Sequence, residues 1–258
     1  MPTFNNNLQG GRTVAGNALA PRSRRAGTQQ TNDYWSGLTP SVSAAYPIEF
    51  FAVAGGGGGG AGFNNGATSA NGGTGGGGGG SQTAVLNRVA GTYTITVGTG
   101  GAYGPYPSPN GSTGGTSSVT DPSNNTVCTA AGGGGGQSNA NPATNGAGGT
   151  GTTWNGGSGN STGGTTSTWT GTNVSYSYSG TAGVGNANTN AGDIGAGGNS
   201  GGGNPFAGSY GMNGSTFLRL PTTYASKVVA TTGSPTISTS GSYTFYKWTS
   251  SGTVTLLP

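Results

Sequence analysis

The chain reads Ile-Glu-Phe-Phe-Ala-Val-Ala-Gly-Gly-Gly-Gly-Gly-Gly from Ile48 to Gly60. An apolar run of this length, rich in aromatic and β-branched residues, is typical of a buried strand, and here it passes directly into six glycines. A similar transition occurs at residues 130–136, and residues 75–80 are a second run of six glycines. The fold therefore depends on what an uninterrupted glycine run does after a strand has fixed its starting point.

Glycine makes up 60 of the 258 residues. It has no side chain to bury, and it loses more backbone freedom on folding than any other residue. Ordering a residue costs about 1–2 kcal/mol of backbone entropy, which amounts to roughly 60–120 kcal/mol for sixty glycines. The runs are therefore either disordered, or packed backbone against backbone with dense hydrogen bonding.

The rest of the composition favours order. Glycine and proline together make 73 residues, a level that suggests low complexity, but only eight basic and four acidic residues are present. A solvated, disordered chain normally carries far more charge. The abundant Ser, Thr and Asn side chains bond to nearby backbone and favour turns over helices. We expect an ordered, loop-rich protein without helices, with disorder as the alternative for single runs.

Polyglycine II helices are one way to order such runs. The polyproline II conformation has three residues per turn and no internal hydrogen bonds, so its N–H and C=O groups point outward. Adjacent glycine helices can satisfy one another, because no side chain stands between them. We expect several runs to pack in this way, and hexaglycines found as isolated exposed loops would contradict that. The block at residues 197–203 is interrupted by Asn199 and Ser200, which leaves the number of packed helices open.

The strand patterns predict an all-β fold with little or no helix, in which short antiparallel strands combine with glycine-rich loops. We divide the chain into an extended arm (1–46), a glycine-rich domain (47–221) and a small C-terminal β-meander (222–258). The alternation of apolar residues with threonine at 92–97 is typical of a half-buried strand. The expected strands are 48–54, 84–86, 92–97, 119–130, 216–220, 235–239, 243–249 and 253–257.

The N-terminal arm concentrates the positive charge of the chain. We expect it to anchor the protein on an acidic surface of a neighbouring protein, since so few charges without interleaved aromatic residues make a nucleic-acid arm a weaker interpretation. A partly mobile terminus is the alternative. The anchoring candidates are Arg12, Arg22, Arg24, Arg25, Tyr34 and Trp35.

The lack of a second cysteine and of a signal-peptide pattern bears on the cellular compartment in which the protein is made. Cys128 is the single cysteine, so no intrachain disulfide can form. The first twenty residues lack the apolar core of a signal peptide, and residues 48–54 are too short to span a bilayer. We expect synthesis in a cytosol and no membrane insertion.

The sequence offers little for catalysis. It contains no histidine, the commonest general base and metal ligand. The four carboxylates, Asp33, Glu49, Asp121 and Asp193, are far apart in sequence. G-x-G-x-x-G matches arise by chance at this glycine content and lack the strand-to-helix context. We expect a protein that is not an enzyme and that uses no cofactor or metal.

The order of strands and glycine runs resembles the glycine-rich domain of phage tail-fibre, adhesin and other virion proteins. The resemblance rests on 51–60, on Gly-Thr-Tyr-Thr-Ile-Thr-Val-Gly-Thr-Gly-Gly at 91–101, on 114–119 and on 129–136. Thr-Phe-Leu-Arg-Leu-Pro at 216–221 matches the closing strand, and 230–254 resembles the β-tail attached to such domains.

The resemblance implies a phage structural protein on the virion surface. It implies a short tail fibre or fibre tip, commonly trimeric, that binds other virion proteins through its arm and a host-surface glycan or protein through its loops. A capsid-surface decoration or head fibre is the main alternative. An ice-binding or coat protein of packed polyglycine helices is a more distant one, because the chain lacks a strict Gly-X-X period.

Tyrosine and tryptophan provide rigid contact area, so those in the loops are candidates for receptor contact. The alternative for each is that it only caps the end of a glycine helix. The candidates are Tyr103, Tyr106, Trp154, Trp169, Tyr176, Tyr178 and Tyr210.

Overall fold

A computed structural model describes most of one compact unit of the chain, which extends from Ala45 to Pro258. The described residues are 46–64, 70–71, 76–87, 89–105, 110–138, 147–151, 153, 155–158, 165–170, 174–177, 194–198 and 208–258. Residues 1–45 of the N-terminal arm, with the six anchoring candidates, lie outside them.

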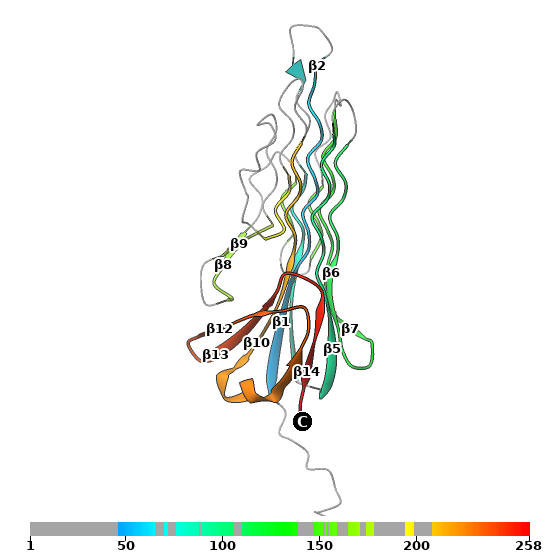
Figure 1. Ribbon diagram of the computed structural model, residues 1–258. Helices are drawn as coiled ribbons and strands as arrows, with labels where there is room; N and C mark the ends of the chain where they lie inside the picture. The colour runs from blue at the N-terminus through cyan, green and yellow to red at the C-terminus, as the bar shows by residue number, and fades with distance from the viewer. Residues whose placement is uncertain are drawn as a thin grey trace, which may run out of the picture. The chain divides into compact units, whose positions relative to one another are not determined.

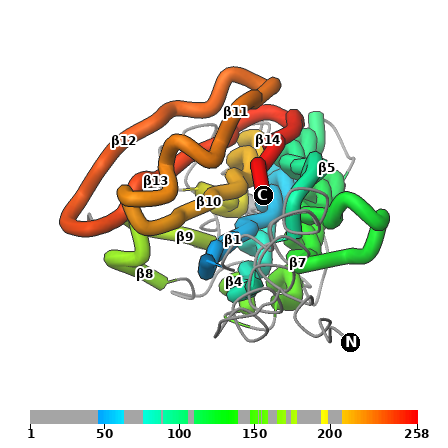
Figure 2. The backbone as a smooth tube through the Cα atoms, turned by 90° about the horizontal axis from the view of Figure 1, so that it is seen from below, coloured from blue at the N-terminus to red at the C-terminus, as the bar shows by residue number. Residues whose placement is uncertain are grey.

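Two five-stranded antiparallel sheets form a sandwich at one end of this unit (Figures 1 and 2). The first sheet has the order β12 (Thr236–Ser240), β13 (Tyr243–Trp248), β10 (Ser215–Pro221), β1 (Pro47–Val53) and β4 (Ser81–Asn87). The second has the order β11 (Val228–Thr231), β14 (Gly252–Leu256), β5 (Gly91–Thr96), β6 (Ser117–Thr120) and β7 (Thr126–Ala130). The prediction of an all-β fold with short antiparallel strands is confirmed.

Smaller elements complete the unit. Two short hairpins pair β2 (Phe63–Asn64) with β3 (Ala70–Asn71), and β8 (Thr165–Ser167) with β9 (Val174–Tyr176). A 3₁₀ helix, η2 (Thr222–Lys227), connects β10 to β11. Within the described ranges no helix is long and apolar enough to cross a membrane.

The sandwich core follows from strand periodicity. In β5, Tyr93 and Ile95 are buried, while the threonines between them are exposed. Strand β1 is buried along nearly its whole length, because its Phe50 face joins the core between the sheets and its Phe51 face is covered from outside. The expected buried strand at 48–54 is confirmed.

Beyond β1, the chain continues as an extended glycine segment with a hydrogen-bond period of three residues. The N–H groups of Gly55 and Gly58 donate to Gly115 and Ser112, which belong to one neighbouring segment. The intervening residues donate to other segments. A three-residue period with every bond made to another segment is the hydrogen-bond pattern of polyglycine II helices.

Six segments surround the central one at residues 54–60. Every residue from 54 to 62 is buried, so the first hexaglycine is the interior of a bundle and not an exposed loop. The segments that accept hydrogen bonds from it are 76–80, 111–115 and 208–214, and those that donate to it are 98–104, 131–136 and 195–198. The expected polyglycine packing is confirmed for the runs at 55–60, 76–80 and 132–136. Residues 195–198, which include the first two glycines of the interrupted block, also take part.

From residues 54–60 to residues 131–136, consecutive segments alternate in direction. All the segments together form a bundle that continues from one end of the sandwich (Figure 1). Ser117 connects the two regions. Its buried hydroxyl donates to the Val53 carbonyl at 2.7 Å and accepts from the N–H of Gly98 at 2.9 Å. This links the points where β1 and β5 become glycine segments, so the sheets fix the position of each segment. We call these packed segments the glycine bundle.

One expected strand and the expected C-terminal meander differ from the structure. Residues 119–130 form the hairpin β6–β7 and not one strand, because Asp121 accepts from the N–H groups of Ser123 and Asn125 and Asn124 has a φ of 65°. The three C-terminal strands also do not form the expected meander, because β12 pairs with β13 but β13 does not pair with β14. β12 and β10 occupy both edges of β13, so β14 crosses to the second sheet and lies between β11 and β5.

Candidate binding groove

The outer face of the first sheet carries a cluster of aromatic side chains. Phe51 and Phe217 are cross-strand partners whose ring centroids lie 5.8 Å apart. Tyr176 packs edge-on against Phe51 at 5.2 Å, and Trp169 lies 5.4 Å from the same ring. Burial in this cluster raises the pKa of Tyr176. The β8–β9 hairpin therefore covers part of this face.

Arg219 holds the connecting turn of that hairpin against the sheet. Its Nε and Nη2 donate to the two carboxylate oxygens of Glu49 at 2.7 and 3.0 Å, and its Nη1 donates to the Trp169 carbonyl at 3.0 Å. The guanidinium carbon lies 4.5 Å from the Trp169 ring centroid and 4.8 Å from that of Tyr243. Arg219 thus joins a bidentate ion pair to two stacking contacts.

Strand register places further side chains beside the cluster. Because directly opposed residues in antiparallel strands share a face, β10, β13 and β12 align rows of side chains on the outer face. Each row extends from β10 to the edge strand β12. The rows are Phe217–Lys247–Thr236 and Arg219–Phe245–Ser238.

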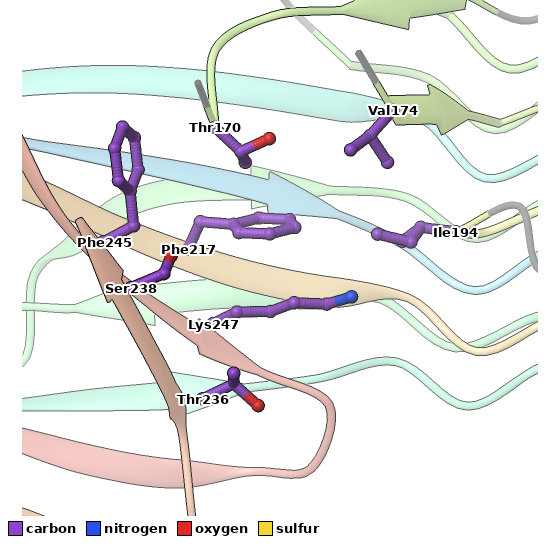
Figure 3. A pocket seen from close by; sticks show the side chains of 8 residues that line it. All are labelled: Thr170, Val174, Ile194, Phe217, Thr236, Ser238, Phe245 and Lys247. Carbon is purple, nitrogen blue, oxygen red and sulfur yellow. The ribbon is translucent and has the colours of Figure 1, made fainter. Parts of the chain in front are cut away.

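These rows border a half-open cavity of about 180 Å³ (Figure 3). Phe217 and Phe245 are 3% and 4% exposed and provide its apolar wall, with Val174 and Ile194 on the hairpin side. Figure 3 shows the Lys247 side chain alongside the Phe217 ring, with its nitrogen directed toward Ile194. Hydroxyls of threonine and serine complete the lining.

A second, more open cavity of about 440 Å³ shares Ile194 and Lys247 with the first. It extends along the glycine bundle, where Gly100, Tyr210 and Asn213 line it. We call the two cavities together the Lys247 groove.

Lys247 differs from the other described cations. Lys227 donates from Nζ to the Pro258 carbonyl at 2.7 Å, and Arg219 is paired with Glu49. The Lys247 ammonium lies 5.8 Å from the Phe217 ring centroid, near the outer limit of a cation–π contact. Among the described residues it has no carboxylate or carbonyl partner.

The structure places four of the seven predicted contact residues. Tyr103 and Tyr210 form an edge-on pair with centroids 4.8 Å apart on the glycine bundle, and Tyr210 is 60% exposed. Trp169 and Tyr176 instead belong to the packed cluster under the hairpin. Tyr106, Trp154 and Tyr178 lie outside the described residues.

The sequence interpretation did not select Phe217, Phe245 or Lys247. A usable signal was present, since the alternation in Tyr243–Trp248 places residues 243, 245 and 247 on one face of a strand. The sequence could not show which strand lies beside it, and the register with β10 creates the groove.

The side chains that line the groove are better suited to binding a ligand than to catalysing a reaction. Its described lining offers an ammonium group, aromatic walls and hydroxyls, with no carboxylate. In the described ranges, no three His, Cys, Asp or Glu side chains gather closely enough to hold a metal ion. The single thiol lies elsewhere, in the sandwich core, where burial raises the pKa of Cys128 to about 12.

Comparison with known proteins gives a family for most of the chain. Residues 36–220, well over half of the chain, match the model of a family described as a glycine-rich domain. No curated protein matches the chain.

Proposed function

The chain belongs to the glycine-rich domain family, and from this premise we propose that it is a non-enzymatic structural protein of a bacteriophage particle. In this proposal it forms a short tail fibre, or the tip of one, and attaches the particle to the host surface. Residues 1–46 anchor it to other virion proteins, and the loops of residues 47–221 face outward.

The glycine bundle is the observation that carries the proposal. Attachment needs a stiff support that holds contact loops away from the particle, and loops on a rigid scaffold commonly carry recognition. Backbone hydrogen bonds from a ring of six segments hold the central one without a conventional side-chain core. The loops joining these segments can therefore vary in sequence while the bundle keeps its hydrogen bonds.

Localisation tests the proposal most directly. Gold-labelled antibodies against the purified protein should mark the distal tail of intact particles in electron micrographs. Labelling of the capsid would support a head fibre or decoration protein in its place. Particles without any label would contradict a virion protein of either kind.

Attachment is tested separately. Purified protein, added before the phage, should occupy host receptors and slow particle adsorption. The matched control is the same protein after heat unfolding, which should have no effect. If the antibodies mark the tail but the added protein leaves adsorption unchanged, this would contradict the attachment role and leave the structural role standing.

Sedimentation of the purified protein should give the mass of three copies, in accordance with the trimer that we propose.

A further inference from the structure

We propose that the Lys247 groove binds an acidic sugar unit, with the Lys247 ammonium contacting the acid group and the aromatic wall contacting the sugar ring. This inference rests on the proposed attachment function and names the chemistry of the receptor. The acid group is a carboxylate or a phosphate, because both suit an ammonium point charge.

The charge of the groove points to an anion. In a chain with few charged side chains, Arg219 and Lys227 both have oxygen partners, whereas Lys247 faces two cavities with none among the described residues. Partial burial beside Phe217 lowers the local dielectric, and this strengthens its attraction for an anion. The ring contact is weak enough to leave the ammonium available.

The walls point to a sugar. Phe217 and Phe245, with 3% and 4% of their surface exposed, offer a small apolar contact for a C–H edge of a sugar ring, and Thr236 and Ser238 add hydroxyls to the lining. Binding sites of this kind combine apolar walls with a few placed polar groups. A simple inorganic anion would use Lys247 and leave these walls without a role.

The size of the groove indicates how much sugar fits. The first cavity, about 180 Å³, is below the roughly 300–1,000 Å³ of sites for drug-sized ligands, and we assign it one sugar ring. The second, about 440 Å³, continues from Lys247 toward Tyr210. A following unit of a surface polysaccharide can occupy it while the acid group stays at Lys247.

The experiment is a ligand titration of the full chain. Calorimetry and saturation-transfer NMR measure the binding. The probes are glucuronic acid, glucose 6-phosphate, glucose and inorganic phosphate. We expect both acidic sugars to bind at least about tenfold more tightly than glucose, the ratio expected for one charge-assisted contact. They should also bind more tightly than inorganic phosphate, which lacks the sugar ring. The preferred acid group identifies the source, a uronic acid or a sugar phosphate.

Matched variants locate the site. Lys247→Met should weaken the binding of acidic sugar at least about tenfold, whereas Lys227→Met should leave it unchanged. The double variant Thr236→Val with Ser238→Ala should weaken binding, and Thr239→Val, on the opposite face of the same strand, should not. Far-UV circular dichroism and thermal unfolding check that each variant is folded.

Three results would overturn the inference. Equal binding of glucose and glucuronic acid would remove the role of the charge. Inorganic phosphate binding as tightly as glucose 6-phosphate would leave an anion site only. Unchanged binding in folded Lys247→Met would place the sugar elsewhere. None of these results affects the localisation experiment, so failure here is distinguishable from failure of the proposed function.

Discussion

A single methyl group added to Gly57 has no space in the glycine bundle. A Cβ at this position would overlap the carbonyl group of Gly134, whose backbone is held by its own hydrogen bonds. We expect Gly57→Ala to lower the free energy of unfolding by about 1–3 kcal/mol or more, as overpacked cores do. Urea denaturation measures this.

Gly241→Ala is the matched control for that prediction. Gly241 lies in the β12–β13 turn with nothing within 4 Å of an added Cβ, and its φ of 58° gives alanine only a local backbone cost of about 1–2 kcal/mol. A smaller loss in Gly57→Ala than in this control would mean that the bundle backbones can separate easily.

Cys128 reports on the closure of the sandwich. Its thiol is 1% exposed, and burial raises its pKa from 9.0 to about 12. Because the thiolate is the reactive form, iodoacetamide at pH 8.5 should label the protein only after denaturant is added. Rapid labelling of the folded protein, read by mass spectrometry, would contradict this.

The same thiol makes stability depend on alkaline pH. The unfolded chain loses the thiol proton near pH 9, while the folded chain keeps it until about pH 12. The unfolded state therefore binds fewer protons in this interval, and the contribution of Cys128 to the free energy of unfolding falls as pH rises from about 9 to 12. A Cys128→Ala variant should lack this component in urea titrations.

At the scale of elements, sequence pattern predicts strands better than their partners. The alternation in β5 and the apolar run in β1 are local signals, and both strands were expected. The β6–β7 hairpin was missed although Asp-Pro-Ser-Asn-Asn at 121–125 carries recognisable turn chemistry. The place of β14 depends on β13 having both edges paired, a non-local fact that no window of sequence contains.

Arg219 gives an element-scale prediction. Arg219→Lys keeps the charge but loses the two-pronged contact with Glu49 and the planar stacking between Trp169 and Tyr243. We expect the free energy of unfolding to fall by about 1–3 kcal/mol, since the ion pair is only about one fifth exposed. Increased proteolysis near Trp169 should accompany the loss.

Lys227→Met is the control for Arg219→Lys, because the hydrogen bond of Lys227 with Pro258 is exposed. Its effect should stay within about 0.5 kcal/mol. Equal stability of Arg219→Lys and the unaltered protein would show that the hairpin is held mainly by its aromatic contacts.

At the scale of the whole molecule, the glycine amides should be unusually protected. The N–H groups of Gly55 to Gly58 are buried and bonded to three different segments. Their hydrogen exchange should therefore require opening of the bundle and approach the rate set by global unfolding. Exchange at peptide rates, measured by NMR, would contradict a packed bundle in solution.

The bundle and the groove differ in how far the sequence reveals them. Sixty glycines with little charge favour packed backbone over a solvated coil, although disorder stayed the alternative for single runs. The groove is not visible in the sequence, since Phe217, Lys247 and Thr236 become neighbours only through the register of three strands. The function is harder to predict from the sequence than the bundle or the groove, because the ligand is not part of the chain.

The three-residue bond period also limits how such a protein can change length. Each added triplet extends a glycine segment by about 9 Å and returns every later donor to the direction it faced before. An insertion of one or two residues instead rotates those donors toward the wrong neighbours. Because segments that follow one another in the chain, such as 54–60 and 76–80, run in opposite directions, each connecting loop must shift by the same step. The gene can therefore lengthen the bundle only in units of nine bases per segment, added in matched pairs.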